Sequence, residues 1–485
     1  MTLSLTDSPA FSWKFLESYL RRYDVHAARH LELLGEVRSR LEAFDLGRNA
    51  DRAASFLCDK DVSREGEAAA GSGRLAAAAN MAEELERLRY QLLNERAAAL
   101  GEEDLRATEE LDRIYARLVD RRTPDGRRAR RLLWNPDFAR DAVERLEQSL
   151  DPALPLEALT ASARRLTEEH FAPESGDRPG KGGRHRVLLY APLYLSNYCV
   201  NGCVYCHFRF DNPMPRIHLS PERAVEEAEY LVARGMRHIL LVAGDYPQLT
   251  GIDYYVSVVD ALRRRFAGQW TVEIAAQSTA SYARLAAAGV LGVTLYQETY
   301  DLSRYAVLHP RGPKTRFDRR LETLERAAEA GIRRLGLGIL LGLAPAAEDA
   351  RTLVRHALYL RQRFPHCTLA VSLPRLHRPP EGFAVPHPVD DATLVRLYCG
   401  LRHALPDAEL VLSTRETASL RDYLAGVCVT QLSAGSSTAP GGYGDRAAGR
   451  AAAGGEQFPV NDERPVEEAA QALRRQGLAV VWESA

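Results

Sequence analysis

Residues 187–206 read VLLYAPLYLSNYCVNGCVYC, an apolar run followed at once by three closely spaced cysteines. The run at 187–195 is short and almost wholly apolar, which is typical of a buried strand. Cys199, Cys203 and Cys206 follow it with the spacing C-x3-C-x2-C. We therefore expect a loop of thiols at the C-terminal end of a buried strand.

These cysteines predict a cluster that takes part in chemistry. Three thiolates can hold three irons of a [4Fe–4S] cluster and leave the fourth iron open to another ligand. Because clusters that only carry electrons usually have four cysteine ligands, a set of three favours a catalytic cluster. Two alternatives stay open: a zinc site with His207 as the fourth ligand, and thiols retained by an inactive homologue.

From Arg186 onward, apolar runs alternate with segments of helical period, which predicts an α/β fold. The expected strands are 187–195, 238–243, 271–276, 292–296, 335–343, 369–373, 410–414 and 427–433. Helical segments between them include 221–234, 254–266, 317–330 and 353–364. Eight such units predict a (βα)8 barrel of the TIM type, with an open doubly wound sheet as the alternative. The barrel is favoured because unusual polar residues recur at the C-terminal ends of the strands.

The chain before the barrel has a different pattern. Residues 1–175 show mainly helical periodicity and predict a helical N-terminal region, 176–185 a linker, and 186–485 the barrel with its C-terminal segment. We expect the helical region to act as a cap or arm on the barrel, and a pair of partner-docking helices is the alternative.

The composition is that of an ordinary globular protein of 485 residues, with 46% hydrophobic and 27% charged residues. A net charge of −1 gives no long-range attraction for nucleic acid. We expect no signal peptide and no membrane span. The other four cysteines are Cys58, Cys367, Cys399 and Cys428. They are scattered along the chain, and their spacing suggests no disulfide framework. Together these features predict a cytoplasmic protein with neither a nucleic-acid nor a membrane partner.

Several phrases resemble the aromatic amino-acid lyases of the radical S-adenosylmethionine (SAM) superfamily, of the ThiH-like 2-iminoacetate synthase type and the related HydG type. They are APLYLSNYC (191–199), LYQETY (295–300), SLPRL (372–376), STRE (413–416) and SAGSSTAPGGY (433–443). The resemblance runs from roughly 187 to 482. HydG has further cysteines in a C-terminal extension, whereas Cys428 is the last here, so the ThiH type is favoured; HPRGPK at 309–314 is nearer to HydG.

The resemblance implies an activity. A reduced [4Fe–4S] cluster would cleave SAM to methionine and a 5′-deoxyadenosyl radical, which takes a hydrogen atom from the amine of L-tyrosine. Cleavage of the Cα–Cβ bond would then give p-cresol and dehydroglycine (2-iminoacetate) for the thiazole of thiamine. The alternatives are a lyase for another aromatic amino acid such as tryptophan, a HydG-like maturase, or a non-catalytic scaffold. Implied partners are a reductant such as flavodoxin or ferredoxin, and thiazole synthase.

The resemblance also implies roles for individual residues. Cys199, Cys203 and Cys206 would bind the cluster. The residues expected around SAM are Tyr205 near the adenine, Gly244 and Asp245 after the second strand, Gln297 and Glu298 after the fourth, and Arg415 after the seventh. The alternative roles are an N-cap for Asp245, a structural carboxylate for Glu298 and substrate binding for Arg415.

Two residues are expected at the substrate. Arg375 would grip the substrate carboxylate through two parallel hydrogen bonds, and Tyr194 would lie beside the substrate, with a core aromatic as the alternative. The chain departs from its relatives at three places. Asp245 replaces a glutamate, His207 replaces a glycine, and PRLHRP at 374–379 replaces Pro-Arg-Leu-Arg-Pro.

Overall fold

The computed structural model describes residues 12–55, 101–119, 126–172, 184–449 and 454–484, together with Met81, Glu84, Leu85, Leu88, Arg89, Gln91 and Leu92. The chain divides into two compact units. One holds residues up to Thr123 and the short piece 278–280, and the other holds the remainder from Pro124. The predicted linker, 176–185, lies outside the described residues except for its last two positions.

The first unit is helical, as predicted. Its helices are α1 (Trp13–Tyr23), α2 (Ala27–Ser55) and α4 (Glu102–Val119). They bury a small apolar core whose members include Leu16, Leu20, Val37, Leu88 and Ile114. The Tyr19 hydroxyl donates a hydrogen bond to Asp104 at 2.5 Å, which joins α1 to α4 inside this core.

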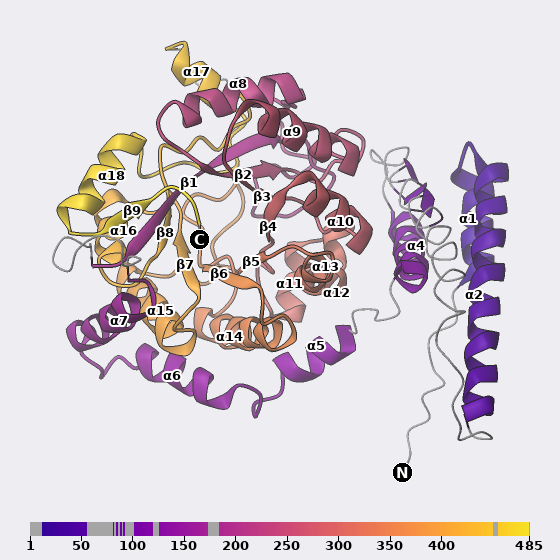
Figure 1. The fold of residues 1–485 in the computed structure, drawn as a ribbon, viewed down its shortest axis with the longest axis horizontal. Coiled ribbons are helices and arrows are strands. Elements are labelled where there is room, and N and C mark those ends of the chain that lie inside the picture. The colour runs from indigo at the N-terminus through magenta and orange to yellow at the C-terminus, as the bar shows by residue number, and fades with distance from the viewer. Residues whose placement is uncertain are drawn as a thin grey trace, which may run out of the picture. The chain divides into compact units, whose positions relative to one another are not determined.

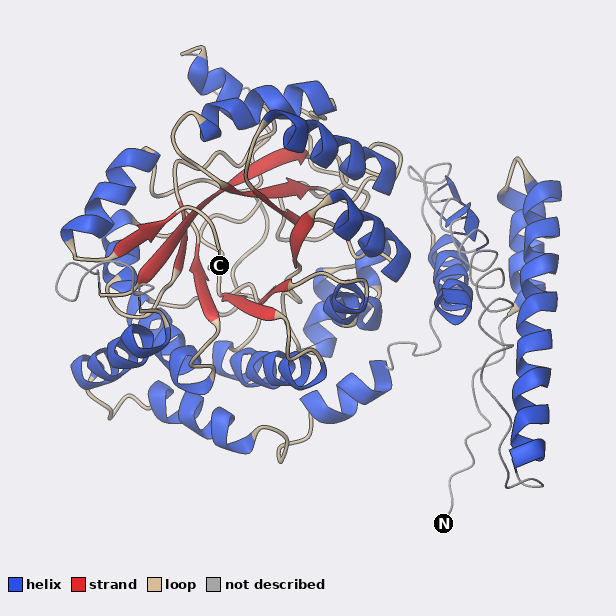
Figure 2. Ribbon diagram, in the orientation of Figure 1, coloured by secondary structure: helices blue, strands red, loops and turns tan. Residues whose placement is uncertain are grey.

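The second unit contains a closed barrel of eight parallel strands (Figures 1 and 2). The strands are β1 (Arg186–Ser196), β2 (His238–Ala243), β3 (Gln269–Glu273), β4 (Val290–Thr294), β5 (Arg334–Gly338), β6 (Thr368–Ser372), β7 (Glu409–Leu412) and β8 (Gln431–Ser433). Each strand pairs with the next, and β1 also pairs with β8, which closes the ring. The (βα)8 prediction is therefore confirmed, and the open sheet was the wrong alternative.

Helices follow the strands and cover the outside of the barrel (Figure 2). They are α8 (Pro221–Val232), α9 (Ile252–Arg265), α10 (Thr279–Ala288), α11 (Leu302–Leu308), α12 (Phe317–Leu321), α13 (Thr323–Glu329), α14 (Ala346–Arg363), α15 (Asp391–Ala404), α16 (Ala418–Ala425), α17 (Gly442–Ala447) and α18 (Val466–Arg475). The expected helix 317–330 is split at Glu322 into α12 and α13. A short final strand, β9 (Ala479–Val481), pairs with the first three residues of β1.

Three further helices belong to the barrel unit although they precede β1. They are α5 (Gly126–Leu133), α6 (Arg140–Leu150) and α7 (Leu156–His170), and Figure 1 shows them along the outside of α14 and α15. The approach is close, since a Cβ on Gly400 of α15 would lie 2.8 Å from the Leu146 side chain. The compact unit thus begins at Pro124 rather than at 186, because these helices bury Leu146, Leu159 and Ala163 in the core shared with the barrel.

Within the described part of the chain, every helix is too short or too polar to cross a lipid bilayer.

Candidate active site

The cysteine loop follows β1 and is tied to two neighbouring β–α connections. Val200 donates its backbone N–H to the Asp245 carbonyl at 2.8 Å, in the connection after β2. Gly202 donates its backbone N–H to the Arg311 carbonyl at 3.1 Å, in the connection after β4. The loop therefore lies at the C-terminal ends of the strands, where barrel enzymes hold their chemistry.

Asn201, between the first two cysteines, braces this loop. Its side-chain amide donates to the Asp245 carboxylate at 3.1 Å and lies 3.7 Å from the Cys199 sulfur. Its amide oxygen accepts the backbone N–H of Lys314 at 2.9 Å. Gly312 has a φ of +89°, and a Cβ there would lie 2.3 Å from that oxygen, so the approach requires glycine. Sequence reasoning missed Asn201, whose only signal was its place inside the cysteine motif.

Cys203 is buried, whereas Cys199 and Cys206 are partly buried. Burial raises the pKa of Cys199 to about 11 and that of Cys203 to about 12, and it also raises that of Cys206. Cys206 further raises the pKa of the other two, so the three groups are within electrostatic reach of one another. A bound iron–sulfur cluster would offset this cost, because iron stabilises the thiolate form. Three soft sulfur donors in one partly buried loop fit a [4Fe–4S] cluster.

The zinc alternative finds no support in the residues that the structure describes. His207, the proposed fourth ligand, instead places its Nδ1 3.0 Å from the Gln457 carbonyl.

Tyr205, expected near the adenine of SAM, is held by a buried histidine. Its hydroxyl donates to His309 Nε2 at 2.8 Å, and His309 Nδ1 donates to the Tyr305 carbonyl at 2.8 Å. Burial lowers the pKa of His309 to about 3, so its ring is neutral and can accept this bond. The hydroxyl of Tyr205 is thereby occupied, which leaves its ring as the part that can contact a ligand.

Gly244 allows the cysteine loop to approach the end of β2. A Cβ at this position would lie 2.2 Å from the Tyr198 carbonyl, so no other residue could replace the glycine without moving the loop. Asp245 follows it, and its carboxylate accepts from Asn201. The pair expected at SAM therefore also positions the first cysteine.

Glu298 is a buried carboxylate that faces two cations. Its Oε1 lies 2.6 Å from Lys314 Nζ and 3.2 Å from Arg320 Nη2. Burial alone would raise the pKa of Glu298, but the two cations outweigh it and hold the pKa below the usual value. Glu298 also has a φ of +73°, rare for a residue with a side chain. Its neighbour Gln297 has a buried side-chain nitrogen with no hydrogen-bond partner within the described residues.

An upper cavity lies inside the barrel near the C-terminal ends of the strands. Residues that line it include Tyr194, Glu273, Tyr296, Arg415, Gln457 and Phe458. Of the two expected substrate residues, Tyr194 is present, and its hydroxyl donates to the Gln457 side chain at 2.7 Å. Arg415 also lines the cavity, with its guanidinium carbon 3.4 Å from the centre of the Phe458 ring.

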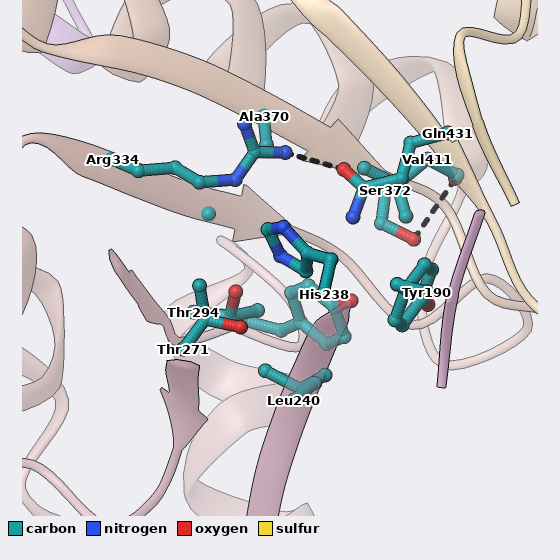
Figure 3. A pocket seen from close by; sticks show the side chains of 12 residues that line it. Tyr190, His238, Leu240, Thr271, Thr294, Arg334, Ala370, Ser372, Val411 and Gln431 are labelled. Carbon is teal, nitrogen blue, oxygen red and sulfur yellow. Dashed lines mark hydrogen bonds between the residues drawn. The ribbon is translucent and has the colours of Figure 1, made fainter. Parts of the chain in front are cut away.

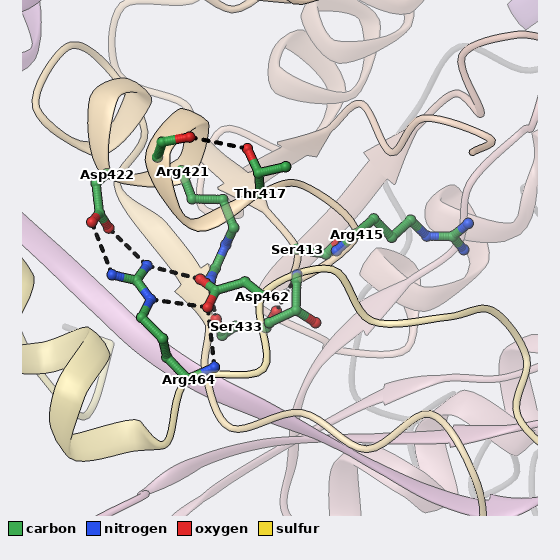
Figure 4. A network of polar contacts seen from close by, with 10 residues as sticks. Ser413, Arg415, Thr417, Arg421, Asp422, Ser433, Asp462 and Arg464 are labelled. Atoms are coloured by element: carbon green, nitrogen blue, oxygen red, sulfur yellow. Dashed lines mark hydrogen bonds and ion pairs between the residues drawn. The ribbon is translucent and has the colours of Figure 1, made fainter. Parts of the chain in front are cut away.

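The segment that carries Gln457 and Phe458 is fixed by an ion-pair network (Figure 4). Asp462 accepts from Arg421 and Arg464, and Arg464 makes two bonds of 2.9 Å with Asp422 of α16. Figure 4 shows the Arg415 side chain extending away from this network. The network therefore positions the segment, whereas Arg415 is directed elsewhere.

Arg375, the expected carboxylate clamp, already has protein partners. Its Nε donates to Glu416 at 2.9 Å, its Nη2 donates to the other oxygen of the same carboxylate, and its Nη1 donates to the Val389 carbonyl. Asp391 lies 2.8 Å from Nη2, and His377 Nε2 lies 3.1 Å from Glu416. The fork of Arg375 is thus filled by Glu416, and Arg415 is the cation that lines the upper cavity.

Glu273, at the end of β3, is a cavity residue that sequence reasoning missed. Burial raises its pKa to about 7, the charge of Glu298 acts in the same direction, and Arg415 opposes both. A signal existed, because Glu273 is the charged residue in the apolar run 271–276.

A lower cavity is lined by residues at the start of strands, among them His238, Arg334 and Gln431 (Figure 3). Arg334, the first residue of β5, donates to the Gln431 side chain and pairs with Glu409. His238, the first residue of β2, bonds the Gln269 side chain at 3.2 Å. Arg334 and His238 therefore both have protein partners.

Two family models match the barrel unit. The Radical SAM superfamily matches residues 193–357, and the Biotin and Thiamin Synthesis associated domain matches residues 372–479. The 2-iminoacetate synthase of Escherichia coli (strain K12) is 37% identical over 329 residues, which are 67% of this chain and 82% of that protein.

Solved structures share the fold. The FeFe-hydrogenase maturase HydG from Carboxydothermus hydrogenoformans is 31% identical with a TM-score of 0.62, over 74% of this chain and 84% of that one. Methylornithine synthase (PylB) is 20% identical with a TM-score of 0.54, over 73% and 97% of the two chains, which shows the common fold alone.

Proposed function

Because the chain belongs to the 2-iminoacetate synthase family of the radical SAM superfamily, we propose that it cleaves the Cα–Cβ bond of L-tyrosine to p-cresol and dehydroglycine. The observation that carries this proposal is 37% identity over 82% of a 2-iminoacetate synthase. The family predicted from the sequence is confirmed, as is its class, a radical SAM carbon–carbon lyase.

Cys199, Cys203 and Cys206 would hold the [4Fe–4S] cluster. When bound, the cluster and SAM supply the 5′-deoxyadenosyl radical that starts the reaction. Gly244 gives the cysteine loop its close seat on β2, and Asn201 fixes the loop to Asp245. Around SAM we assign Tyr205, Gly244, Asp245, Gln297, Glu298 and, as an alternative to its substrate role, Arg415.

The substrate would occupy the upper cavity. Its carboxylate needs a cation, and Arg415 lines this space. Arg375 is the alternative, but its use requires Glu416 to release the guanidinium. Tyr194 and Phe458 offer aromatic surface for the ring, and the segment around Gln457 closes part of the cavity to water.

The proposal includes partners that the family implies. A one-electron reductant such as flavodoxin or ferredoxin would reduce the cluster, and thiazole synthase would receive dehydroglycine. A cytoplasmic location belongs to the same proposal, because the cluster is sensitive to oxygen.

The test is an assay of the anaerobically reconstituted protein with dithionite, SAM and L-tyrosine, followed by chromatography with mass detection. We expect p-cresol together with an equal amount of 5′-deoxyadenosine. L-tryptophan is assayed in parallel. Formation of 5′-deoxyadenosine without p-cresol would contradict tyrosine as the substrate. If a protein with an intact cluster formed neither product, that result would contradict the lyase activity.

A further inference from the structure

Glu273 differs from the other carboxylates in the interior of the barrel unit. Glu298 pairs with Lys314 and Arg320, and Glu416 pairs with Arg375. By contrast, the structure shows no hydrogen bond and no ion pair to the Glu273 side chain from any residue that it describes. The Glu273 side chain is partly buried, and a carboxylate in the barrel interior without a partner is costly to keep, so its position calls for a ligand.

The position of Glu273 matches one end of a zwitterion. It ends β3, and Arg415 follows β7, four strands away in the eight-strand ring, so the two come from opposite sides of the barrel. Both line the upper cavity, and Arg415 acts on Glu273 electrostatically. The cavity therefore presents one cation and one anion to the same space, which suits the carboxylate and the ammonium of an α-amino acid.

We propose that Glu273 receives the ammonium group of the substrate and takes a proton from it before the radical step. The inference rests on the proposed function, in which a hydrogen atom leaves the substrate nitrogen. The N–H bond breaks, an O–H bond forms on the carboxylate, and the lone pair stays on nitrogen. No oxidant or reductant is needed for this transfer.

The chemistry requires such a group. The α-amino group of a peptide has a pKa near 8 and that of a free amino acid lies higher, so the substrate ammonium is protonated at pH 7. A positive nitrogen has no lone pair to stabilise a radical after the hydrogen atom is lost. A base therefore has to act first, and general bases work best when their pKa lies near the working pH, as that of Glu273 does at about 7.

The other carboxylates near the site are less suited to this role. Glu298 is held in its charged form by two cations, and Asp245 is bonded to Asn201. The titratable and charged groups within electrostatic reach of Glu273 are Tyr190 and Tyr194 of β1, Tyr296 and Glu298 after β4, Lys314 and Arg320 farther along that connection, and Arg415 after β7. The tyrosines are neutral, because burial raises the pKa of each above its usual value.

The decisive variant is Glu273→Gln, which keeps the shape of the side chain and removes the base. We expect p-cresol formation at pH 7 to fall roughly 100-fold or more, with unchanged cluster absorption. The wild-type kcat/KM should decline below about pH 7, where Glu273 becomes protonated. In the variant, kcat/KM should instead rise about tenfold per pH unit, because only the fraction of substrate whose amine is already neutral can react. A variant with the wild-type pH profile and rate would overturn the proposal.

A binding experiment separates this proposal from the proposed function. Calorimetry with L-tyrosine and with 3-(4-hydroxyphenyl)propionate, which lacks the amine, is done on wild type and variant. We expect Glu273→Gln to weaken the binding of L-tyrosine roughly 10- to 100-fold and to leave the binding of the propionate unchanged. That result supports the Glu273–ammonium contact even if the wild type makes no p-cresol. Equal weakening of both ligands would refute it.

Glu273→Asp guards against misfolding of the glutamine variant. It keeps the carboxylate but shortens its reach, so we expect a lower kcat with the acidic limb of the wild-type profile retained. Loss of that limb in Glu273→Asp would contradict the proposal.

Discussion

The upper and lower cavities lie in the same barrel and share Tyr190 and Tyr296, yet they differ in whether their arginine has an ion-pair partner. In the lower cavity Arg334 forms an ion pair with Glu409 and donates to Gln431, so its charge is neutralised by the protein itself. In the upper cavity, the structure records no ion pair to Arg415 from the residues that it describes. The comparison shows which end of the barrel stabilises the fold and which end is prepared for a ligand.

The difference follows from the direction of the strands. Side chains at the start of a parallel strand face short connections and are covered by neighbouring strands, as His238 and Arg334 are. Side chains at the end of a strand face long connections, and here these carry the cysteine loop and the segment around Gln457. Substitutions at the two ends should therefore affect different measurements.

The largest effect should come from the cysteine loop above the upper cavity. Cys203→Ser removes one thiolate of three, and we expect loss of the iron–sulfur absorption band and of both p-cresol and 5′-deoxyadenosine. Iron content and absorption after anaerobic reconstitution provide the measurement. Cys367→Ser is the control, because that buried thiol bonds the Ile332 carbonyl elsewhere in the fold. An intact cluster in Cys203→Ser would refute the ligand assignment.

In the lower cavity, Arg334→Met should cost stability rather than chemistry. It leaves Glu409 without its buried cation, and we expect the free energy of unfolding to fall by about 3 kcal/mol. Urea denaturation of wild type and variant measures the change. Arg333→Met is the matched control, since that neighbouring side chain is exposed. Equal stability of all three proteins would show that the lower cavity is not a structural layer.

At the other end of the barrel, Arg415→Met should affect the substrate and spare the fold. Without a cation for the substrate carboxylate, we expect kcat/KM for L-tyrosine to fall roughly 10- to 100-fold. Steady-state kinetics and a thermal melt, compared side by side, make the measurement. Arg378→Met removes an exposed arginine as the control.

Arg375→Met then decides between the two arginines. Because it removes the arginine that neutralises the buried Glu416 and leaves that carboxylate with His377, we expect it to lower the melting temperature. A stable Arg375→Met protein with a raised KM, together with an Arg415→Met protein of unchanged kinetics, would indicate that Arg375 binds the substrate carboxylate.

The sequence predicted the parts of the molecule that depend on local pattern. Apolar runs between amphipathic segments predicted eight strands near their observed positions, and the cysteine spacing predicted the loop after β1. The pairing of Arg375 with Glu416 was not predictable, because its partners are 41 residues apart and meet only in the closed barrel. The docking of α6 on α15 was missed for a similar reason, because the apolar face of a helix does not indicate which element it will pack against. Glu273 could have been noticed, since a carboxylate ending an apolar strand is unusual.

The smallest effect concerns His238 at the floor of the lower cavity. Burial lowers its pKa to about 3, whereas the unfolded chain binds this proton near pH 6.5. Between these values the unfolded state binds more protons, so stability falls as the pH falls, by up to about 1.4 kcal/mol per unit. His185, His309 and His356, whose pKa values burial also lowers, add to the same slope.

His238→Gln should therefore reduce the slope of stability against pH without abolishing it. Glutamine can still donate to Gln269 but binds no proton, so the contribution of one site is lost. Urea denaturation at pH 7.5, 6 and 5 measures the slope. His366→Gln removes an exposed imidazole and should leave the slope unchanged. An equal slope in wild type and His238→Gln would mean that water reaches His238, and the lower cavity would then resemble the upper one.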